Sequence, residues 1–122
     1  MGVVYHTNYI KWFEVGRTEL LRDEGIVYAA LERDGYYLPV TECACHYRAP
    51  ARYDDVLCVK TQITYLRRAT IRFDYIISDE EGILTYVDGY TVHAFTDGKR
   101  KIVRAPKYVA EIIRKLGGEC RW

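Results

Sequence analysis

Apolar residues recur at helical spacing near the start of the chain. Six of them form one wide stripe: Tyr9, Trp12, Phe13, Gly16, Leu20 and Leu21. The pattern predicts a long helix with its N-cap at Thr7 or Asn8 and its end at Gly25, because glycine adopts a left-handed backbone without steric cost. A glycine inside a helix costs roughly 1 kcal/mol relative to alanine, so Gly16 predicts close packing of this helix on a sheet.

From residue 36 onward the apolar pattern has a period of two, which is typical of strands. The expected elements, in order, are a short helix or turn at 26–33, strands at 36–48, 56–66, 70–78 and 83–96, a return strand or tail at 99–104, and a helix at 106–116. Pro39 indicates an edge strand or a bulge, and Gly89 indicates a bulge or a bend. The Asp97-Gly98 pair predicts a hairpin turn.

The alternation also assigns side chains to the two faces of the sheet. In the strand at 70–78 the apolar residues point one way and Arg72 and Asp74 point the other. In the preceding strand Tyr65 is expected on the same face as Ile63. One helix cannot cover both faces of so long a sheet. The tyrosines and aliphatic residues left on the second face therefore predict self-association, as a two-fold dimer.

Length and composition narrow the class of protein. The 122 residues predict one domain over 1–122, and a net charge of +1 gives no electrostatic case for nucleic acid or an anionic membrane. No apolar run approaches the roughly 20 residues that span a bilayer, and no signal peptide is visible. The four cysteines are expected to be reduced thiols of a cytoplasmic protein. Only Cys43 and Cys45 are closely spaced, so no metal site is predicted.

Three stretches carry a family resemblance. Gly2-Val3-Val4-Tyr5-His6, followed by 8–14 and 17–21, resembles the hotdog-fold acyl-CoA thioesterases, in the 4-hydroxybenzoyl-CoA thioesterase or YbgC-like branch. Residues 47–55 resemble the second segment of that family, and the likeness covers almost the whole chain. The resemblance implies an α+β hotdog fold, in which a curved antiparallel sheet wraps a long central helix. It also implies homodimers formed through sheet edges, often assembled into tetramers.

The start of the chain departs from the family pattern. In that branch an aspartate lies three residues before the glycine that matches Gly2, and it attacks the thioester or activates water. The sequence starts at Met1, so this acid and the strand that carries it would lie upstream of residue 1. The expectation is a shortened start, rather than a protein that works without the acid. The absent strand would leave a sheet edge exposed.

The expected site lies at the beginning of the long helix, where free N–H groups and a partial positive charge collect. By resemblance the backbone amide of His6 is the oxyanion donor, with Val4, Tyr5 and Asn8 beside the substrate. Glu14 follows His6 by eight residues, the spacing of the catalytic glutamate in a second hotdog thioesterase branch. The alternative is that Glu14 only pairs with Arg17 or Lys11 on a solvated face.

Further charged residues are candidates for binding coenzyme A. Arg67 and Arg68, with Arg48 and Arg52 as weaker candidates, could hold its phosphates, because guanidinium groups bind phosphate bidentately. The alternative for Arg67 and Arg68 is an ordinary charged turn. Four further ionisable residues are expected to be structural or to balance nearby charges: His46, Asp74, Asp88 and His93.

The predicted function is hydrolysis of an acyl-CoA thioester to the free acid and coenzyme A, without a cofactor. The alternative is a hotdog protein that binds an acyl-CoA, or serves as a scaffold, without hydrolysing it. A hotdog dehydratase is a weaker third interpretation, because its histidine-bearing glycine-proline loop is not present.

Overall fold

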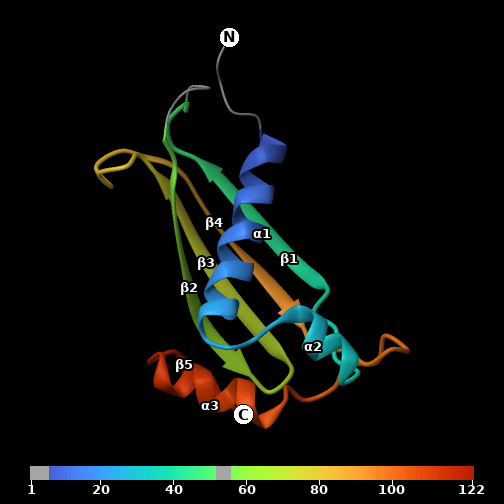
Figure 1. The fold of residues 1–122 in the computed structure, drawn as a ribbon. Helices are drawn as coiled ribbons and strands as arrows, with labels where there is room; N and C mark the ends of the chain where they lie inside the picture. Colours follow the sequence, from blue (N-terminus) through green and yellow to red (C-terminus); the bar gives the residue numbers. More distant parts are fainter. Residues whose placement is uncertain (1–5, 52–55) are drawn as a thin grey trace.

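The structure, a computed structural model, describes residues 6–51 and 56–122, with side chains from Tyr9 onward in the first range. Its elements in chain order are α1 (His6–Asp23), α2 (Tyr28–Arg33), β1 (Val40–Tyr47), β2 (Cys58–Arg67), β3 (Thr70–Ser78), β4 (Thr85–Ala94), α3 (Lys107–Lys115) and β5 (Glu119–Arg121). The strands form one sheet in the order β1-β4-β3-β2-β5, antiparallel except for β5 against β2. The helix α1 lies across one face of this twisted sheet, as a hotdog fold requires (Figure 1).

Close contact with the sheet fixes the position of α1. A Cβ atom on Gly16 would lie 2.3 Å from Thr61 Oγ1 and 2.9 Å from Val59 Cγ1, both on β2. The prediction that this glycine allows close packing is therefore confirmed. Tyr9 and Phe13 are fully buried as predicted, whereas Trp12 is 39% exposed and does not belong to the buried stripe.

The two ends of α1 differ in how well they were predicted. Gly25 ends the helix with φ of 85°, and the N–H groups of Gly25 and Ile26 donate to Arg22 and Leu21 carbonyls, which is a Schellman motif. At the other end the helix already includes His6. The predicted N-cap at Thr7 or Asn8 is therefore wrong, because both residues lie within the first turn.

The strands follow the predicted alternation, with local corrections. β3 spans the predicted residues, and its four apolar side chains are buried. β1 starts only at Val40, after Pro39, and it is an edge strand with an irregularity between Val40 and Glu42. Gly89, in contrast, pairs regularly on both sides, so no bulge exists there. Its Cβ would lie 2.2 Å from the Ala44 carbonyl oxygen, which explains the glycine.

A bulge in β2 overturns one predicted face. The register shifts between Ile63 and Tyr65, so that Tyr65 lies opposite Arg72 and Leu66 lies opposite Ile71. Cross-strand partners share a face, so Tyr65 lies with Arg72 and not with Ile63. Leu66 takes the buried position and is fully inaccessible to solvent. Strict alternation misses such a shift because one extra residue exchanges the two faces.

Two short elements complete the domain. Residues 26–33, left open as helix or turn, contain the six-residue helix α2. The return of the chain after the Asp97-Gly98 turn is confirmed by an isolated bridge between Thr96 and Ile102. The strand β5 was not predicted, because its three residues are too few to show a period of two. Among the described residues, no helix is long and apolar enough to cross a membrane.

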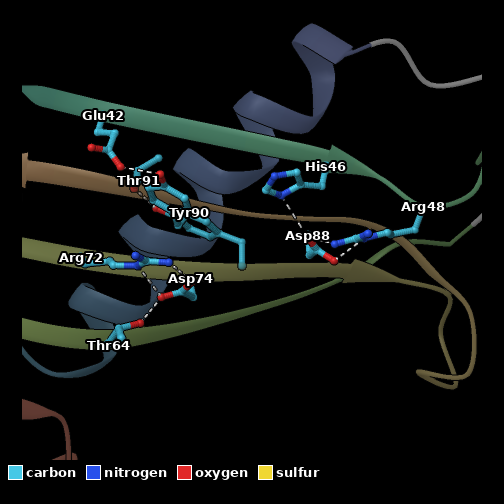
Figure 2. A network of polar contacts seen from close by, with 10 residues as sticks. Glu42, His46, Arg48, Thr64, Arg72, Asp74, Asp88, Tyr90 and Thr91 are labelled. Atoms are coloured by element: carbon cyan, nitrogen blue, oxygen red, sulfur yellow. Dashed lines mark hydrogen bonds and ion pairs between the residues drawn. The ribbon is translucent and has the colours of Figure 1, made fainter.

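The sheet face opposite α1 is polar (Figure 2). The Arg72 guanidinium donates two hydrogen bonds to Asp74, each 3.1 Å long, and its Cζ atom lies 4.0 Å from the centre of the Tyr90 ring. The Tyr90 hydroxyl in turn donates to Glu42. The tyrosines on this face thus belong to charge networks, so this face is not the apolar surface from which self-association was predicted.

The sheet face that α1 covers contains a chain of polar groups, which lie between α1 and the sheet. An Arg17 N–H donates to the Tyr75 hydroxyl at 3.1 Å, and the Tyr75 and Thr91 hydroxyls lie 2.6 Å apart. His93 Nε2 lies 2.9 Å from Thr91 Oγ1, and its Nδ1 lies 3.1 Å from the Leu38 carbonyl oxygen. Because a carbonyl only accepts, Nδ1 carries the proton and Nε2 accepts from Thr91. The Tyr75 hydroxyl then donates to Thr91 and the Thr91 hydroxyl donates to His93, so the hydrogen bonds all run from Arg17 toward Leu38.

This arrangement requires a neutral His93. The ring is 1% exposed, and its burial lowers the pKa of His93 to about 4, with the Arg17 charge acting in the same direction. A proton on Nε2 would remove the acceptor that Thr91 uses and would place a second buried cation near Arg17.

We expect the free energy of unfolding to decrease as the pH is lowered, because of His93. The unfolded chain binds a proton near pH 6.5 and the folded chain only near pH 4, so the stabilisation is complete above pH 6.5 and is lost as the pH falls toward 4. The loss is about 3 kcal/mol for this shift. Denaturant unfolding of the parent and of His93→Gln over this range measures it. The variant should show the flatter profile, and equal slopes would contradict the assignment.

We also expect Gly16→Ala to destabilise the fold, although alanine is the better helix former. The new methyl group would overlap Thr61 and Val59, whose β-branched side chains have little rotamer freedom. A loss of about 1–3 kcal/mol in the free energy of unfolding is expected from such overpacking. Lys11→Ala, at another exposed position of α1, is the control, and Thr61→Ala in the Gly16→Ala background should recover part of the loss. A Gly16→Ala chain as stable as its parent would refute the packing argument.

Candidate functional site

The start of α1 lies at the end of β1. The Tyr9 ring contacts the Tyr47 ring edge to face, with 5.5 Å between the centroids, and Tyr47 is the last residue of β1. One turn further, Phe13 packs against Gly89 of β4 and stacks on Tyr75 at 4.4 Å. These contacts hold the first turn of α1 at one end of the sheet. Figure 1 shows the start of α1 toward the arrowhead of β1.

The first turn supplies the chemistry expected there. The first four N–H groups of an α-helix have no acceptor within the helix, and the dipole adds a partial positive charge. The amide of His6 belongs to this turn because α1 includes His6. Two predicted substrate-binding residues, Val4 and Tyr5, lie outside the described residues, as do the side chains of His6 and Asn8.

Glu14 has an exposed carboxylate on α1. The pairing proposed as its alternative role is wrong for Arg17, whose guanidinium donates to Tyr28 at 3.0 Å and to Tyr75 at 3.1 Å. In the part of the chain that the structure describes, Glu14 forms no ion pair with Lys11 either. Eight residues of helix place Glu14 about 12 Å along the axis from His6. One chain therefore does not bring this carboxylate to the helix start.

Arg67 and Arg68 lie far from the start of α1. Tyr47, Val87, Ile77 and Val59 form one row across the sheet, and Arg67 follows Val59 by eight residues of strand, which is about 26 Å.

The arginine pair has structural roles in the β2–β3 turn. Arg67 Nε lies 3.4 Å from a Glu119 carboxylate oxygen, and its guanidinium covers the Tyr65 ring. Arg68 has φ of 54°, and its backbone N–H donates to the Arg121 carbonyl at 2.8 Å. The turn thus uses both residues to connect β5 to the sheet.

The other charged candidates are paired on the outer face. Arg48 Nε donates to Asp88 at 2.7 Å, and His46 Nδ1 lies 3.3 Å from the same carboxylate (Figure 2). The hydrogen bond from Arg48 holds the pKa of Asp88 below its usual range. The prediction that Asp74 and Asp88 balance nearby basic groups is confirmed. Arg52 lies outside the described residues.

Sequence reasoning missed a cleft of about 780 Å³ at the opposite end of β1. Its walls include Tyr37, Leu38, Pro39, Thr96, Gly98 and Arg100. The bridge between Tyr37 and Thr96 brings the two wall segments together, and Asp97 Oδ1 accepts the N–H groups of Lys99 and Lys101. Pro39 and the Asp97-Gly98 turn were visible in the sequence, but nothing there indicated that they are neighbours.

The sequence is similar to those of known thioesterases. Residues 1–86 match the family model of the Thioesterase superfamily. The acyl-CoA thioesterase YbgC of Haemophilus influenzae is 34% identical over 116 residues, covering 94% of this chain and 85% of that protein. The acyl-CoA thioester hydrolase YbgC of Escherichia coli O157:H7 is 37% identical over 83 residues, 68% of this chain and 62% of that protein.

Solved structures agree with the sequence comparisons. The DHNA-CoA thioesterase of Staphylococcus aureus superimposes with a TM-score of 0.86 at 30% identity, covering 96% of this chain and 80% of that chain. The family match includes α1 and the strands through the start of β4, and with them the contact between Tyr9 and Tyr47. The family model and the shared fold agree, and the chain belongs to the Thioesterase superfamily.

Proposed function

We propose that the protein hydrolyses coenzyme A thioesters at the start of α1. The observation that carries the proposal is the position of His6 in the first helical turn, where amide groups have no intrahelical acceptor. An amide there can stabilise the negative charge that develops on a thioester carbonyl oxygen during attack. Membership of the Thioesterase superfamily, with relatives named as acyl-CoA thioesterases, supports this reaction class.

Glu14 is the proposed carboxylate. It takes a proton from water while the water oxygen attacks the thioester carbon, and the tetrahedral intermediate then loses coenzyme A as its thiolate, which receives the proton. Glu14 is suited to this role because it is exposed and unpaired among the described residues. Because Glu14 lies about 12 Å along α1 from His6, the proposal takes the two groups of one site from different chains.

A two-fold dimer through β1 provides the second chain. Along its outer edge β1 has no strand partner among the described residues, and Val40 and Tyr47 are each 51% exposed. Trp12 and Val15 add exposed apolar surface on α1. Antiparallel pairing of β1 with its copy would continue the sheet and cover these residues. Assembly into tetramers and a cytoplasmic location remain predictions.

Within one chain, the geometry does not favour Arg67 and Arg68 as phosphate ligands. Both lie at the end of the sheet remote from the helix start, and Arg67 already has Glu119 as its partner. Binding of coenzyme A phosphates by these residues remains a prediction that rests on the sequence alone.

We expect His6→Pro to lower kcat by about 10²–10³, the usual effect of losing one oxyanion donor. Proline removes the amide hydrogen and is tolerated in the first turn of a helix, so the fold should persist. His6→Ala keeps the amide and removes only the imidazole, so the difference between the two variants reports the amide. Thiol release from short, long and aromatic acyl-CoAs measures turnover, with circular dichroism as the folding control. Equal kcat values in the two variants would exclude the amide.

We expect Glu14→Gln to lower turnover by about 10²-fold or more, as loss of a general base does, while the free energy of unfolding changes little. Glu19→Gln is the matched control on the same helix, because Glu19 is exposed and its ion-pair partner among the described residues is Arg22. A Glu14→Gln protein as active as Glu19→Gln would remove Glu14 from the mechanism. A parent protein that binds acyl-CoA without releasing thiol would support the alternative, a binding or scaffold protein.

A further inference from the structure

Two cysteines lie in the middle of the edge strand β1. Cys43 is exposed and Cys45 is half-buried, and both are free thiols. Cys43 is paired with Thr91 of β4 and Cys45 with Gly89, so both side chains lie on the sheet face that α1 covers. All four cysteines of the sequence fall within the described residues, so every thiol of the chain can be weighed as a disulfide partner.

The geometry of a single chain does not allow any of these thiols to form a disulfide with Cys43 or Cys45. Residues two apart on a strand have parallel side chains about 6.8 Å apart, whereas a disulfide needs Cβ atoms roughly 3.5–4.5 Å apart. Cys58 lies on β2, which β4 and β3 separate from β1 by about 14 Å. Cys120 lies on β5, beyond β2, with its Sγ atom 3.8 Å from the Ala110 carbonyl oxygen. A disulfide partner for Cys43 must therefore come from a second chain.

The backbone of Cys43 and Cys45 faces the free edge of the sheet. A Cβ atom on Gly89 would lie 2.2 Å from the Ala44 carbonyl oxygen, so this carbonyl points toward β4. Backbone groups alternate in direction along a strand, so the N–H and C=O groups of Cys43 and Cys45 point away from β4. Figure 1 shows β1 at the edge of the sheet, and β1 has no strand on this side among the described residues. These two residues would therefore form ladder hydrogen bonds with an added strand.

Two-fold symmetry limits which residues can meet across this edge. In an antiparallel pair of identical strands, one residue lies opposite its own copy and the others follow in reversed order. Pairing over the full strand Val40–Tyr47 puts that residue at the centre, which is Cys43 or Ala44. In the first register Cys43 lies opposite the partner's Cys43, and in the second it lies opposite the partner's Cys45.

Both registers suit a disulfide. Because the backbone groups of Cys43 and Cys45 point outward, the opposed cysteines form a hydrogen-bonded pair, in which Cα atoms are about 5.5 Å apart. Disulfides join Cα atoms that are roughly 4.4–6.8 Å apart, with the commonest values near this distance. The central position of the two cysteines thus brings thiols together whichever of the two registers forms.

We propose that Cys43 is an oxidation site, at which a disulfide joins two copies of this chain across paired β1 strands. The inference rests on the β1 dimer of the proposed function and not on the hydrolysis itself. It adds a covalent and reversible link, which forms only when an oxidant is present.

A hydroperoxide supplies the oxidation. The Cys43 thiolate attacks one oxygen of hydrogen peroxide, which forms a sulfenic acid and releases hydroxide. The opposed thiolate of the partner then attacks the sulfenic sulfur and displaces a second hydroxide. The two hydroxides take up the two thiol protons, so two thiols and one hydrogen peroxide give one disulfide and two waters. Cys43 reacts first because it is exposed, whereas burial raises the pKa of the Cys45 thiol and lowers its thiolate fraction.

The test is oxidation of the purified protein with hydrogen peroxide, followed by alkylation of the remaining thiols and gel electrophoresis without reductant. The parent should move to twice its single-chain mass, and dithiothreitol should reverse the change. Cys43→Ser should lose this band and still sediment as a dimer, because the thiol takes no part in strand pairing. Cys58→Ser is the matched control and should cross-link like the parent. Cys45→Ser should keep the band in the first register and lose it in the second.

Three results would overturn the inference. The first is an oxidised parent that stays at single-chain mass although sedimentation shows a dimer, and the second is a Cys43→Ser chain that cross-links like the parent. The third is a disulfide between Cys43 and Cys45 of one chain, which mass spectrometry of the oxidised protein would detect. A monomeric parent would remove the β1 pairing and the inference with it. Thiol release from acyl-CoAs by the reduced parent is measured separately, so an inert protein that still cross-links would contradict the hydrolysis and not the disulfide.

Discussion

The arrangement of this domain depends on the close approach of α1 to the sheet. Gly16 on the helix and Gly89 on β4 leave no room for a methyl group, the first against Thr61 and Val59 and the second against Ala44 and Phe13. Two missing side chains thus bring helix and sheet together, and the stacked rings of Phe13 and Tyr75 fill the contact between them. The amide groups of the first turn have a defined position only because this contact fixes the helix.

Much of the fold followed from local sequence rules, because the residues concerned act locally. Gly25 ends α1 through its own backbone conformation, and the alternation in 70–78 matches the buried and exposed sides of β3. The rules failed where a distant part of the chain decided the outcome. Gly89 is explained by the neighbouring strand and the helix above it, and the face of Tyr65 by a bulge that lets Leu66 reach the core.

The site was predictable only in part, for the same reason. A helix start and an exposed carboxylate at Glu14 can be derived from spacing, and charge balance correctly explained Asp74 and Asp88. The cleft could not be derived, because it depends on the pairing of Tyr37 with Thr96 across 59 residues of sequence. The ion pair between Arg67 and Glu119 could not be derived either, because the three-residue strand β5 is too short to show a periodic pattern.

The one-way order of the buried hydrogen bonds has a consequence for how α1 and the sheet are coupled within the domain. The chain of donors begins at Arg17 on α1 and ends at the Leu38 carbonyl, and Leu38 also forms a wall of the cleft. Because each group donates to the next, loss of any one donor would leave a buried acceptor unpaired. The order of donors therefore ties the side chain of Arg17 on α1 to the segment that precedes β1.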